Sequence, residues 1–264
     1  KEEMMATTAF ILLLISLVIQ IIYLLRREAP RDRYSPYTIL AAGLLLFAEI
    51  VRRSIEMRFV AVTNTYESLI FFAAVILLLI FLYRTFWRGE VFPLLVFGSG
   101  VVALALLAIA SSPIAPSDVK APIPALQSNW LVLHVTFSFI GEAFFAMGFV
   151  SALYYLLTKD EKKKKILDDF TYKAIAIGYP IFTAGALVFG AIWASYAWGR
   201  FWGWDPKETW AFITWLTYTA FLHSRFIKKF RGPVVAWLSI IGFVFTLFTF
   251  FGVNYLLSGL HSYV

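Results

Sequence analysis

Long apolar runs recur from one end of this chain to the other, and they constrain its fold more than any other feature. A helix of about 18 or more apolar residues can cross a hydrocarbon core ~30 Å thick. The 264 residues are 61% hydrophobic and 15% charged, with a mean hydropathy of +0.78, which is outside the range of soluble domains. Backbone polar groups inside a bilayer must be satisfied within the chain, and helices do this locally. The sequence therefore predicts an all-α protein, a polytopic transmembrane helix bundle with a single membrane domain over residues 1–264.

Polar breaks divide the chain into about eight predicted spans. They cover Ala6–Leu25, Thr38–Val51, Tyr66–Tyr83, Val91–Ala110, Leu131–Leu157, Lys173–Ala197, Trp210–Phe226 and Val234–Leu257. The second run is short and contains Glu49, so it must extend toward Met57 or lie tilted and sheltered.

Basic residues lie mainly in alternate loops, and this asymmetry predicts the orientation of the bundle. The odd-numbered loops hold 16 of the 23 Lys and Arg residues, whereas the remaining 7 lie on the other side. Since basic loops stay cytoplasmic, both termini and the Pro-rich segment Ser111–Asn129 are predicted to face outward. The run Lys162–Lys165 is interpreted as a solvated cytoplasmic anchor. Membrane orientation also accounts for the net charge of +7, so nucleic acid is not a predicted partner.

The chain contains no cysteine, which excludes several kinds of site. A disulfide, an iron–sulfur cluster and a thiolate zinc site all need cysteine sulfur. A CxxCH haem-attachment motif is absent for the same reason. Any haem must be bound noncovalently.

Tryptophan is concentrated in one predicted outer loop. Six of the nine tryptophans fall between Trp193 and Trp215, and three of these, Trp198, Trp202 and Trp204, lie within seven residues. An aromatic belt at the membrane interface is the simpler explanation, but a belt needs only one or two rings per helix end. Glycines such as Gly199 let the backbone approach a flat ligand, and indole faces stack on planar macrocycles. The loop, residues 198–210, is therefore predicted to bind such a ligand.

Two of the three histidines are predicted to lie on the same side as this loop. His134 begins the fifth predicted span and His261 follows the eighth. Haem iron takes imidazole as an axial ligand, so two such side chains can ligate it from opposite faces. A lone interfacial histidine is the alternative for each residue.

Three further ionisable residues fall within predicted spans. His223 lies 13 residues after Trp210, which places it ~20 Å deeper, toward the cytoplasmic half. An intramembrane ionisable residue is a functional candidate, although His223 could also reach the cytoplasmic interface near Arg225. For Glu49 and Glu142, a polar packing bond and a proton or ligand role remain open.

The motifs resemble those of a known family. The segment Trp198-Gly-x-x-Trp202-x-Trp204-Asp205 is similar to the WWD signature of haem-handling membrane proteins. Together with Trp204-Asp-Pro-Lys-Glu-Thr-Trp210, Asn64-x-Tyr66-Glu67-Ser68 and Gly252-Val-Asn254…Gly259-Leu-His261-Ser-Tyr263, it resembles the CcsA/ResC subunit of the System II cytochrome c synthase. This resemblance runs from about Arg53 to the C-terminus.

The resemblance implies that the protein moves haem b to the outer face of a bacterial inner membrane or thylakoid and presents it for attachment to apocytochrome c. His134 and His261 match the family's external haem ligands, and His223 matches a histidine that binds haem within the membrane. In the family a CcsB/ResB-type partner supplies the second ligand of the inner site. The chain has no fourth histidine, so such a partner is implied, and with it haem lyase activity. Asp205 either caps or fixes the loop, or pairs with Arg200.

Three alternative functions are also compatible with the sequence. The first is a membrane cytochrome with two histidine ligands that transfers electrons. The second is a haem chaperone of the CcmC type, although those chains are shorter and lack the later histidine arrangement. The third is a transporter of another aromatic ligand.

Overall fold

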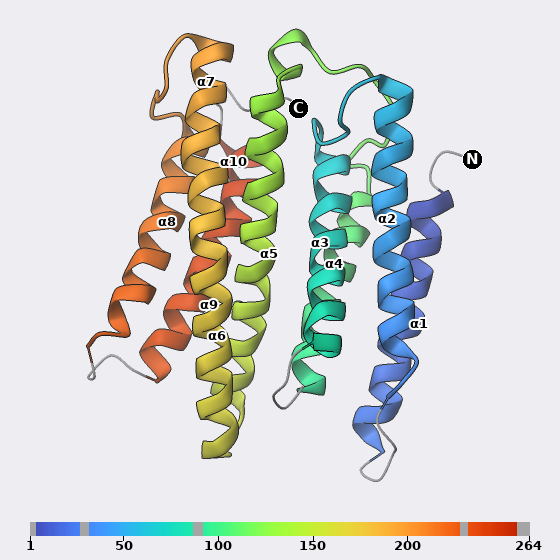
Figure 1. Ribbon diagram of the computed structural model, residues 1–264, viewed down its shortest axis with the longest axis vertical. Coiled ribbons are helices and arrows are strands. Elements are labelled where there is room, and N and C mark those ends of the chain that lie inside the picture. The colour runs from blue at the N-terminus through green and yellow to red at the C-terminus, as the bar shows by residue number, and fades with distance from the viewer. Residues whose placement is uncertain (1–3, 27–31, 87–91, 228–231, 258–264) are drawn as a thin grey trace. The chain divides into compact units, whose positions relative to one another are not determined.

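The computed structural model describes residues 4–26, 32–86, 92–227 and 232–257, and its elements are helices joined by loops (Figure 1). The prediction of an all-α membrane bundle is confirmed. The chain divides into two compact units, Lys1–Gln127 and Ser128–Val264. We refer to them as unit 1 and unit 2.

Unit 1 contains four long helices that pack as a ring. The helices are α1 (Met4–Leu25), α2 (Ser35–Met57), α3 (Thr65–Phe86) and α4 (Pro93–Ala110), followed by the short 3-10 turn η1 (Pro124–Leu126). Helix α2 packs on α1 and α3, and α4 packs on α3 and α1. Of the two alternatives for the short second run, the structure shows the extension: α2 continues past Val51 to Met57 and gains the length to cross a bilayer.

Unit 2 contains four helical rods, two of which are interrupted by π-helical turns. The first rod is α5 (Asn129–Leu157), and the second joins α6 (Glu161–Phe182), the π turn η2 (Thr183–Phe189) and α7 (Gly190–Trp198). The third is α8 (Pro206–Ser224), and the fourth joins α9 (Pro233–Leu247), the π turn η4 (Phe248–Gly252) and α10 (Val253–Leu256). Helix α5 packs on α6 and α9, while α8 packs on α9 and α6.

Six of these helical segments are long and apolar enough to cross a membrane, among the residues that the structure describes. Helices α2 and α8 are the remaining two predicted spans. They are 23 and 19 residues long, so each reaches across ~30 Å. Polar residues lower their hydropathy, but each packs beside two of the apolar helices of its own unit.

The start of α6 differs from the prediction. The sixth span was expected to begin at Lys173, with Lys162–Lys165 in a loop, but the helix begins at Glu161. The Asp160 carboxylate caps this end by accepting hydrogen bonds from the backbone N–H groups of Lys162 and Lys163, at 2.9 and 3.3 Å. Lysine is a good helix former, so once capped the basic run extends the helix by three turns before the apolar part.

Glycines allow α5 to approach its neighbour closely. A Cβ added to Gly141 would lie 2.7 Å from the backbone N of Phe182, and one added to Gly178 would lie 2.8 Å from the carbonyl oxygen of Gly141. Small residues at helix contacts strengthen packing in membranes, where a hydrophobic driving force between helices is absent. This seam holds the second rod of unit 2 against α5.

A buried ion pair organises one end of unit 1. Arg53 of α2 and Glu67 of α3 are 1% and 0% exposed, and the guanidinium donates to Oε1 of Glu67 at 3.2 and 3.3 Å. Arg53 also donates to the carbonyl oxygens of Ser117 and Asp118 at 2.8 and 3.2 Å. The pair thus binds the loop after α4 to two helices, and it gives the Tyr66-Glu67 motif a structural role. Glu49 is also paired, with Arg52 at 2.8 Å, which is the polar packing alternative for that residue.

Candidate functional site

The Trp-rich loop connects α7 to α8 at one end of unit 2 (Figure 1). We call this the Trp-loop end of the unit. Helix α7 ends where Gly199 adopts a left-handed conformation with φ of 74° and donates its N–H to the carbonyl of Ser195 at 3.0 Å. Glycine suits this position because a Cβ disfavours positive φ.

Asp205 and Glu208 anchor the other end of the loop through a capping box. The Asp205 carboxylate accepts a hydrogen bond from the backbone N–H of Lys207 at 3.1 Å. The Glu208 carboxylate accepts from the backbone N–H groups of Asp205 and Gly203 at 3.2 and 2.7 Å. Of the roles left open for Asp205, the structure therefore shows the cap, while the Arg200 side chain folds over Gly203.

Trp202 and Trp204 form one wall of a small hollow. Trp204 is 66% exposed and has a φ of 56°, a strained value for an aromatic residue that the adjacent cap maintains. Its ring meets the Trp202 ring edge-on at 5.7 Å between centroids, and both rings lie 6.3 Å from Phe212 of α8. With Leu187 of η2 these rings line a hollow of about 260 Å³. The hollow is open and apolar, and it is suited to the edge or face of a flat apolar ligand.

His134 is held in one orientation by the π turn η2. Its Nδ1 donates to the carbonyl oxygen of Gly185 at 2.9 Å, and that oxygen also accepts the N–H of Gly190. A carbonyl can only accept, so the proton of neutral His134 resides on Nδ1 and the lone pair on Nε2. A Cβ on Gly190 would lie 2.9 Å from Nδ1, so glycine makes room for the ring. This is the second-sphere bond that a metal-ligating imidazole typically makes.

The predicted tryptophans divide into two groups. The ring of His134 lies parallel to Trp193, at 6.1 Å between centroids and 9° between planes, and Trp193 meets Trp198 at 4.8 Å. Trp202 and Trp204 instead gather with Phe212. Trp193 and Phe212 were not predicted to belong to the site; their spacing of one to two helical turns from the motif is the signal that could have identified them.

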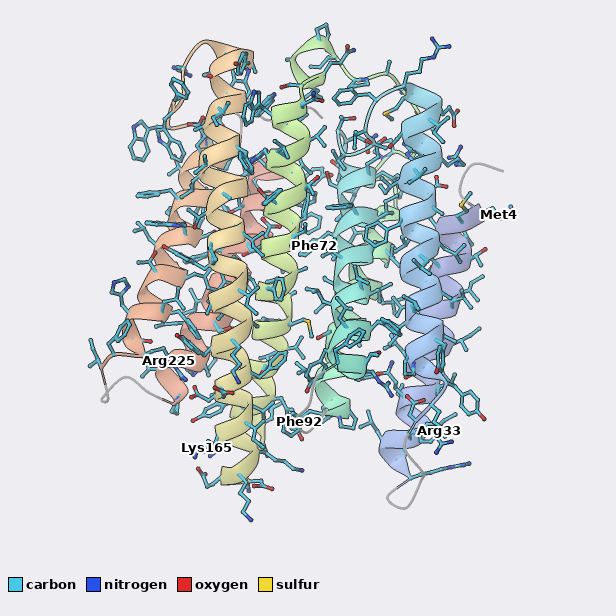
Figure 2. All side chains as sticks on the ribbon, viewed as in Figure 1. Met4, Arg33, Phe72, Phe92, Lys165 and Arg225 are labelled. Carbon is cyan, nitrogen blue, oxygen red and sulfur yellow. The ribbon has the colours of Figure 1, made fainter. Side chains whose placement is uncertain are left out.

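His223 lies at the opposite end of α8 from the Trp loop. It is exposed, and its Nδ1 lies 2.8 Å from the carbonyl oxygen of Thr219. The 18 residues from Asp205 to His223 correspond to ~27 Å of helix. Arg225, labelled in Figure 2 at this end, donates to Asp168 of α6 at 2.6 Å. The structure thus separates His223 from the Trp loop.

A row of aromatic rings connects these two ends of α8. Phe212 stacks on Trp215 at 5.8 Å and 11°, and Trp215 stacks on Tyr179 of α6 at 5.6 Å and 24°. The hydroxyls of Tyr179 and Thr219 are 2.7 Å apart, and Thr219 is one turn from His223. Phe212, Trp215, Thr219 and His223 follow a spacing of three and four residues, so they share one face of α8. We call this partly exposed surface the α8 aromatic row.

His261 lies outside the residues that the structure describes, so its predicted place beside the Trp loop stays a prediction. Of the other predicted site residues, His134 and Trp198 meet through Trp193. Trp202, Trp204 and the Asp205 cap form the loop itself, and Gly199 starts it.

A family model described as cytochrome c assembly protein matches residues 62–261, which include the Trp loop and all three histidines. The chain belongs to this family. It is of the CcsA type: the cytochrome c biogenesis protein CcsA of Guillardia theta is 35% identical over 96% of this chain and 93% of its own length. CcsA of Heterosigma akashiwo is 34% identical over 86% of this chain and 84% of its own length.

A solved structure also has this fold. The cytochrome c haem lyase CcmF matches with a TM-score of 0.73 and 19% identity, over 95% of this chain and 46% of its own length. At that identity the match establishes the fold of this CcsA-type protein. The predicted membership of the CcsA family is confirmed.

Proposed function

We propose that this protein binds haem b noncovalently at the Trp-loop end of unit 2 and presents it for covalent attachment to apocytochrome c. The orientation of His134 carries the proposal. Its Nδ1 proton is bound by the Gly185 carbonyl, so Nε2 is the ring nitrogen that can ligate iron. We propose His261 as the second ligand of the same haem iron.

The residues at this end fit haem as a substrate. Haem is flat and largely apolar, and the exposed ring of Trp204 and the partly buried ring of Trp202 offer it apolar faces and edges. The capping box holds the loop backbone in position before the ligand arrives, which lowers the entropic cost of binding. The chain has no cysteine, so it cannot form a thioether with the haem it carries.

The attachment reaction needs little covalent chemistry from this chain. Each thiol of the apocytochrome CxxCH motif adds across a haem vinyl group, so that sulfur bonds to one carbon and hydrogen to the other, without net oxidation. The contribution of the protein is to orient the haem edge toward the thiols and to keep the iron reduced. On this basis we assign the protein haem lyase activity together with a partner.

We propose a second haem position at His223, in the last turn of α8. His223 is exposed on unit 2, so a second ligand can reach the iron from outside the unit. The chain has no fourth histidine, and we propose that a CcsB/ResB-type membrane subunit supplies it. The α8 aromatic row lies between the two positions, and its Phe212 and Trp215 rings, with Tyr179, offer moving haem an aromatic surface over part of that distance.

The separation of His134 and His223 argues against an electron-transferring cytochrome that uses both for one haem. His134 contacts η2 near the Trp-loop end, whereas His223 lies in the last turn of α8. The comparisons with CcsA proteins also favour biogenesis over electron transfer.

Haem content and visible spectra of single variants test the two positions. We expect His134→Ala, co-expressed with the partner, to lose the Trp-loop haem and keep the inner haem. His223→Ala should deplete both if haem enters at the inner site. Imidazole should partly restore the spectrum, because it supplies the missing nitrogen donor. Full haem loading at the Trp-loop end in His134→Ala would contradict the proposed ligand.

We also propose that the Trp-loop end faces the outer, periplasmic or lumenal, side. The basic asymmetry of the loops supports this orientation. The chain has no native cysteine, so single cysteines report accessibility directly. An impermeant thiol reagent should label Lys120→Cys from outside and should not label Lys165→Cys. Labelling of position 165 in intact cells would mean that the orientation is inverted.

A further inference from the structure

Helices α5 and α8 and the fourth rod each carry buried polar side chains inside unit 2. Glu142 and Ser138 on α5, one turn apart, are each 8% exposed. Thr214 on α8 and Thr249 in η4 are also buried, and their hydroxyl oxygens are 3.3 Å apart. An ionisable side chain inside a membrane span is costly, so it normally has a specific partner or function.

Lys207 and Asn254 lie at the Trp-loop end of this polar cluster. The Nζ of Lys207, in the first turn of α8, donates to Oδ1 of Asn254 in α10 at 3.0 Å and lies 5.7 Å from the centroid of Phe250. Both residues are partly exposed, unlike Glu142. The Lys207 ammonium also interacts electrostatically with the Glu142 carboxylate. The cluster therefore opens toward the Trp-loop end.

Stacked aromatic rings close the cluster on its other side. Phe145, one turn beyond Glu142 on α5, stacks on Tyr218 of α8 with centroids 3.8 Å apart and planes at 22°. Both side chains are fully buried, and a Cβ on Gly242 of α9 would lie only 2.7 Å from the Tyr218 ring. Lys207 therefore lies at the Trp-loop end of these polar side chains and Phe145 on their other side; we call Glu142, Ser138, Thr214, Thr249 and Lys207 the cup.

Oε2 of Glu142 and Oγ of Ser138 are among the buried oxygens that have unused hydrogen-bonding capacity. Within the described part of the chain, no group hydrogen-bonds Oε2 of Glu142 or Oγ of Ser138. A buried oxygen of this kind is usually satisfied by water, and a carboxylate oxygen can also be satisfied by a proton.

We propose that Glu142 is the proton-binding group of a hydrated cup that exchanges protons with the aqueous phase at the Trp-loop end. A hydronium ion gives its proton to the carboxylate and leaves as water, so the step is a simple proton transfer. Lys207 supplies the counter-charge of the ionised form. This site does not depend on haem binding.

Few other ionisable groups act on the cup. Tyr218 on α8 interacts electrostatically with Glu142, and Asp205 with Lys207. The fourth rod contributes the neutral Thr249 and Asn254, and α6 meets α5 there through Gly178 and Phe182. Because Lys207 follows the cap residue Asp205 closely, the charge of Glu142 also acts on the turn that anchors the Trp loop.

Infrared difference spectroscopy on the full chain in lipid tests this site. We expect a protonated-carboxyl band that titrates with pH, shifts in heavy water and is lost in Glu142→Gln. Glu56→Gln, which removes an exposed carboxyl in unit 1, should leave the band unchanged. In Lys207→Met the band should persist to higher pH, because the ionised carboxylate loses its counter-charge.

Two results would overturn the proposal. One is a spectrum in which Glu142→Gln removes no titrating band. The other is a Glu142 band that does not shift in heavy water, since the cup would then be closed to solvent. If Glu142→Gln fails to fold, the Lys207→Met variant decides: a band with an unchanged midpoint would contradict the role of Lys207 and of the cup.

Discussion

His134 donates its Nδ1 proton to the backbone carbonyl of Gly185, 51 residues further along the chain, at 2.9 Å. This bond links α5 to a π turn, a backbone form that is rare and often found at functional sites. It selects one tautomer of the imidazole and turns the ring parallel to Trp193. The ligand that we assign to haem iron therefore depends on a neighbouring helix for its orientation.

Gly190→Ala should weaken haem binding at the Trp-loop end without unfolding unit 2. The added Cβ would lie 2.9 Å from Nδ1 of His134, so the ring must rotate away from the Gly185 carbonyl. Loss of a bond worth about 1 kcal/mol predicts a decrease in haem affinity of roughly fivefold to tenfold. Haem titration of the purified variant measures this affinity. Gly43→Ala in unit 1, where the new Cβ has an ordinary contact at 3.4 Å, is the matched control.

Asp205→Ala should destabilise the first turn of α8 and loosen the Trp loop. Loss of an N-cap costs about 0.5–2 kcal/mol, and the loop would lose one of its fixed ends. Asp205→Asn can accept the same hydrogen bond, so it should retain stability and haem. Thermal unfolding and haem content distinguish the two variants. If Asp205→Asn loses haem as fully as Asp205→Ala, the charge of Asp205 matters rather than its cap.

Replacing all three loop tryptophans, Trp198, Trp202 and Trp204, by alanine should deplete haem while the bundle still folds. The spans satisfy their own backbone hydrogen bonds, so their folding does not need these rings. Haem content per purified protein is the measurement. Trp237→Ala on α9, which removes a ring that is 55% exposed, is the control and should keep its haem. Normal haem content in the triple variant would exclude the loop as the binding surface.

Glu67→Ala should be strongly destabilising, because it leaves the Arg53 guanidinium buried without its carboxylate. Breaking a buried pair in this way costs about 3–5 kcal/mol. Glu56→Ala on α2 removes an ion pair with Arg52 that is partly exposed, so it should cost less than about 1 kcal/mol. The test compares the free energy of unfolding of Glu67→Ala with that of Glu56→Ala. Equal values would show that the buried pair does not stabilise unit 1.

Unit 1 should lose stability in acid through Asp32. Burial raises the pKa of this carboxyl, but hydrogen bonds from Ser35 and Arg84 outweigh burial, and the pKa is lowered overall. The stabilisation is therefore complete above the unfolded value of about 4 and is lost as pH falls through the lower folded value. Unfolding midpoints of the protein and of Asp32→Asn should converge below about pH 4. Parallel midpoints down to strong acid would contradict this linkage.

Much of the architecture follows from local sequence. Apolar runs separated by polar breaks predicted the eight helical rods, and the minimum length of a membrane span made an extension of α2 toward Met57 one of two expectations for that helix. The predicted start of α6 at Lys173 was wrong. Hydropathy does not detect a charged helical segment, and the Asp160 cap lets this segment begin the helix at Glu161. The Trp loop between two helices was predicted from its glycines and tryptophans, but the loop was expected to reach Trp210, whereas the Asp205 cap starts α8 at Pro206.

The arrangement of the site required tertiary structure. His134 could be placed at a helix end from sequence, but its tautomer depends on a carbonyl 51 residues away. The division of the tryptophans into two groups depends on Trp193 and Phe212, which lie on different helices from one another. The sequence also left the roles of Glu49 and Glu142 open. In the structure the two residues differ, because Glu49 pairs with Arg52 whereas Glu142 is buried inside unit 2. Spacing along a helix determines which face a side chain occupies, but only the packing of helices determines which groups meet across that face.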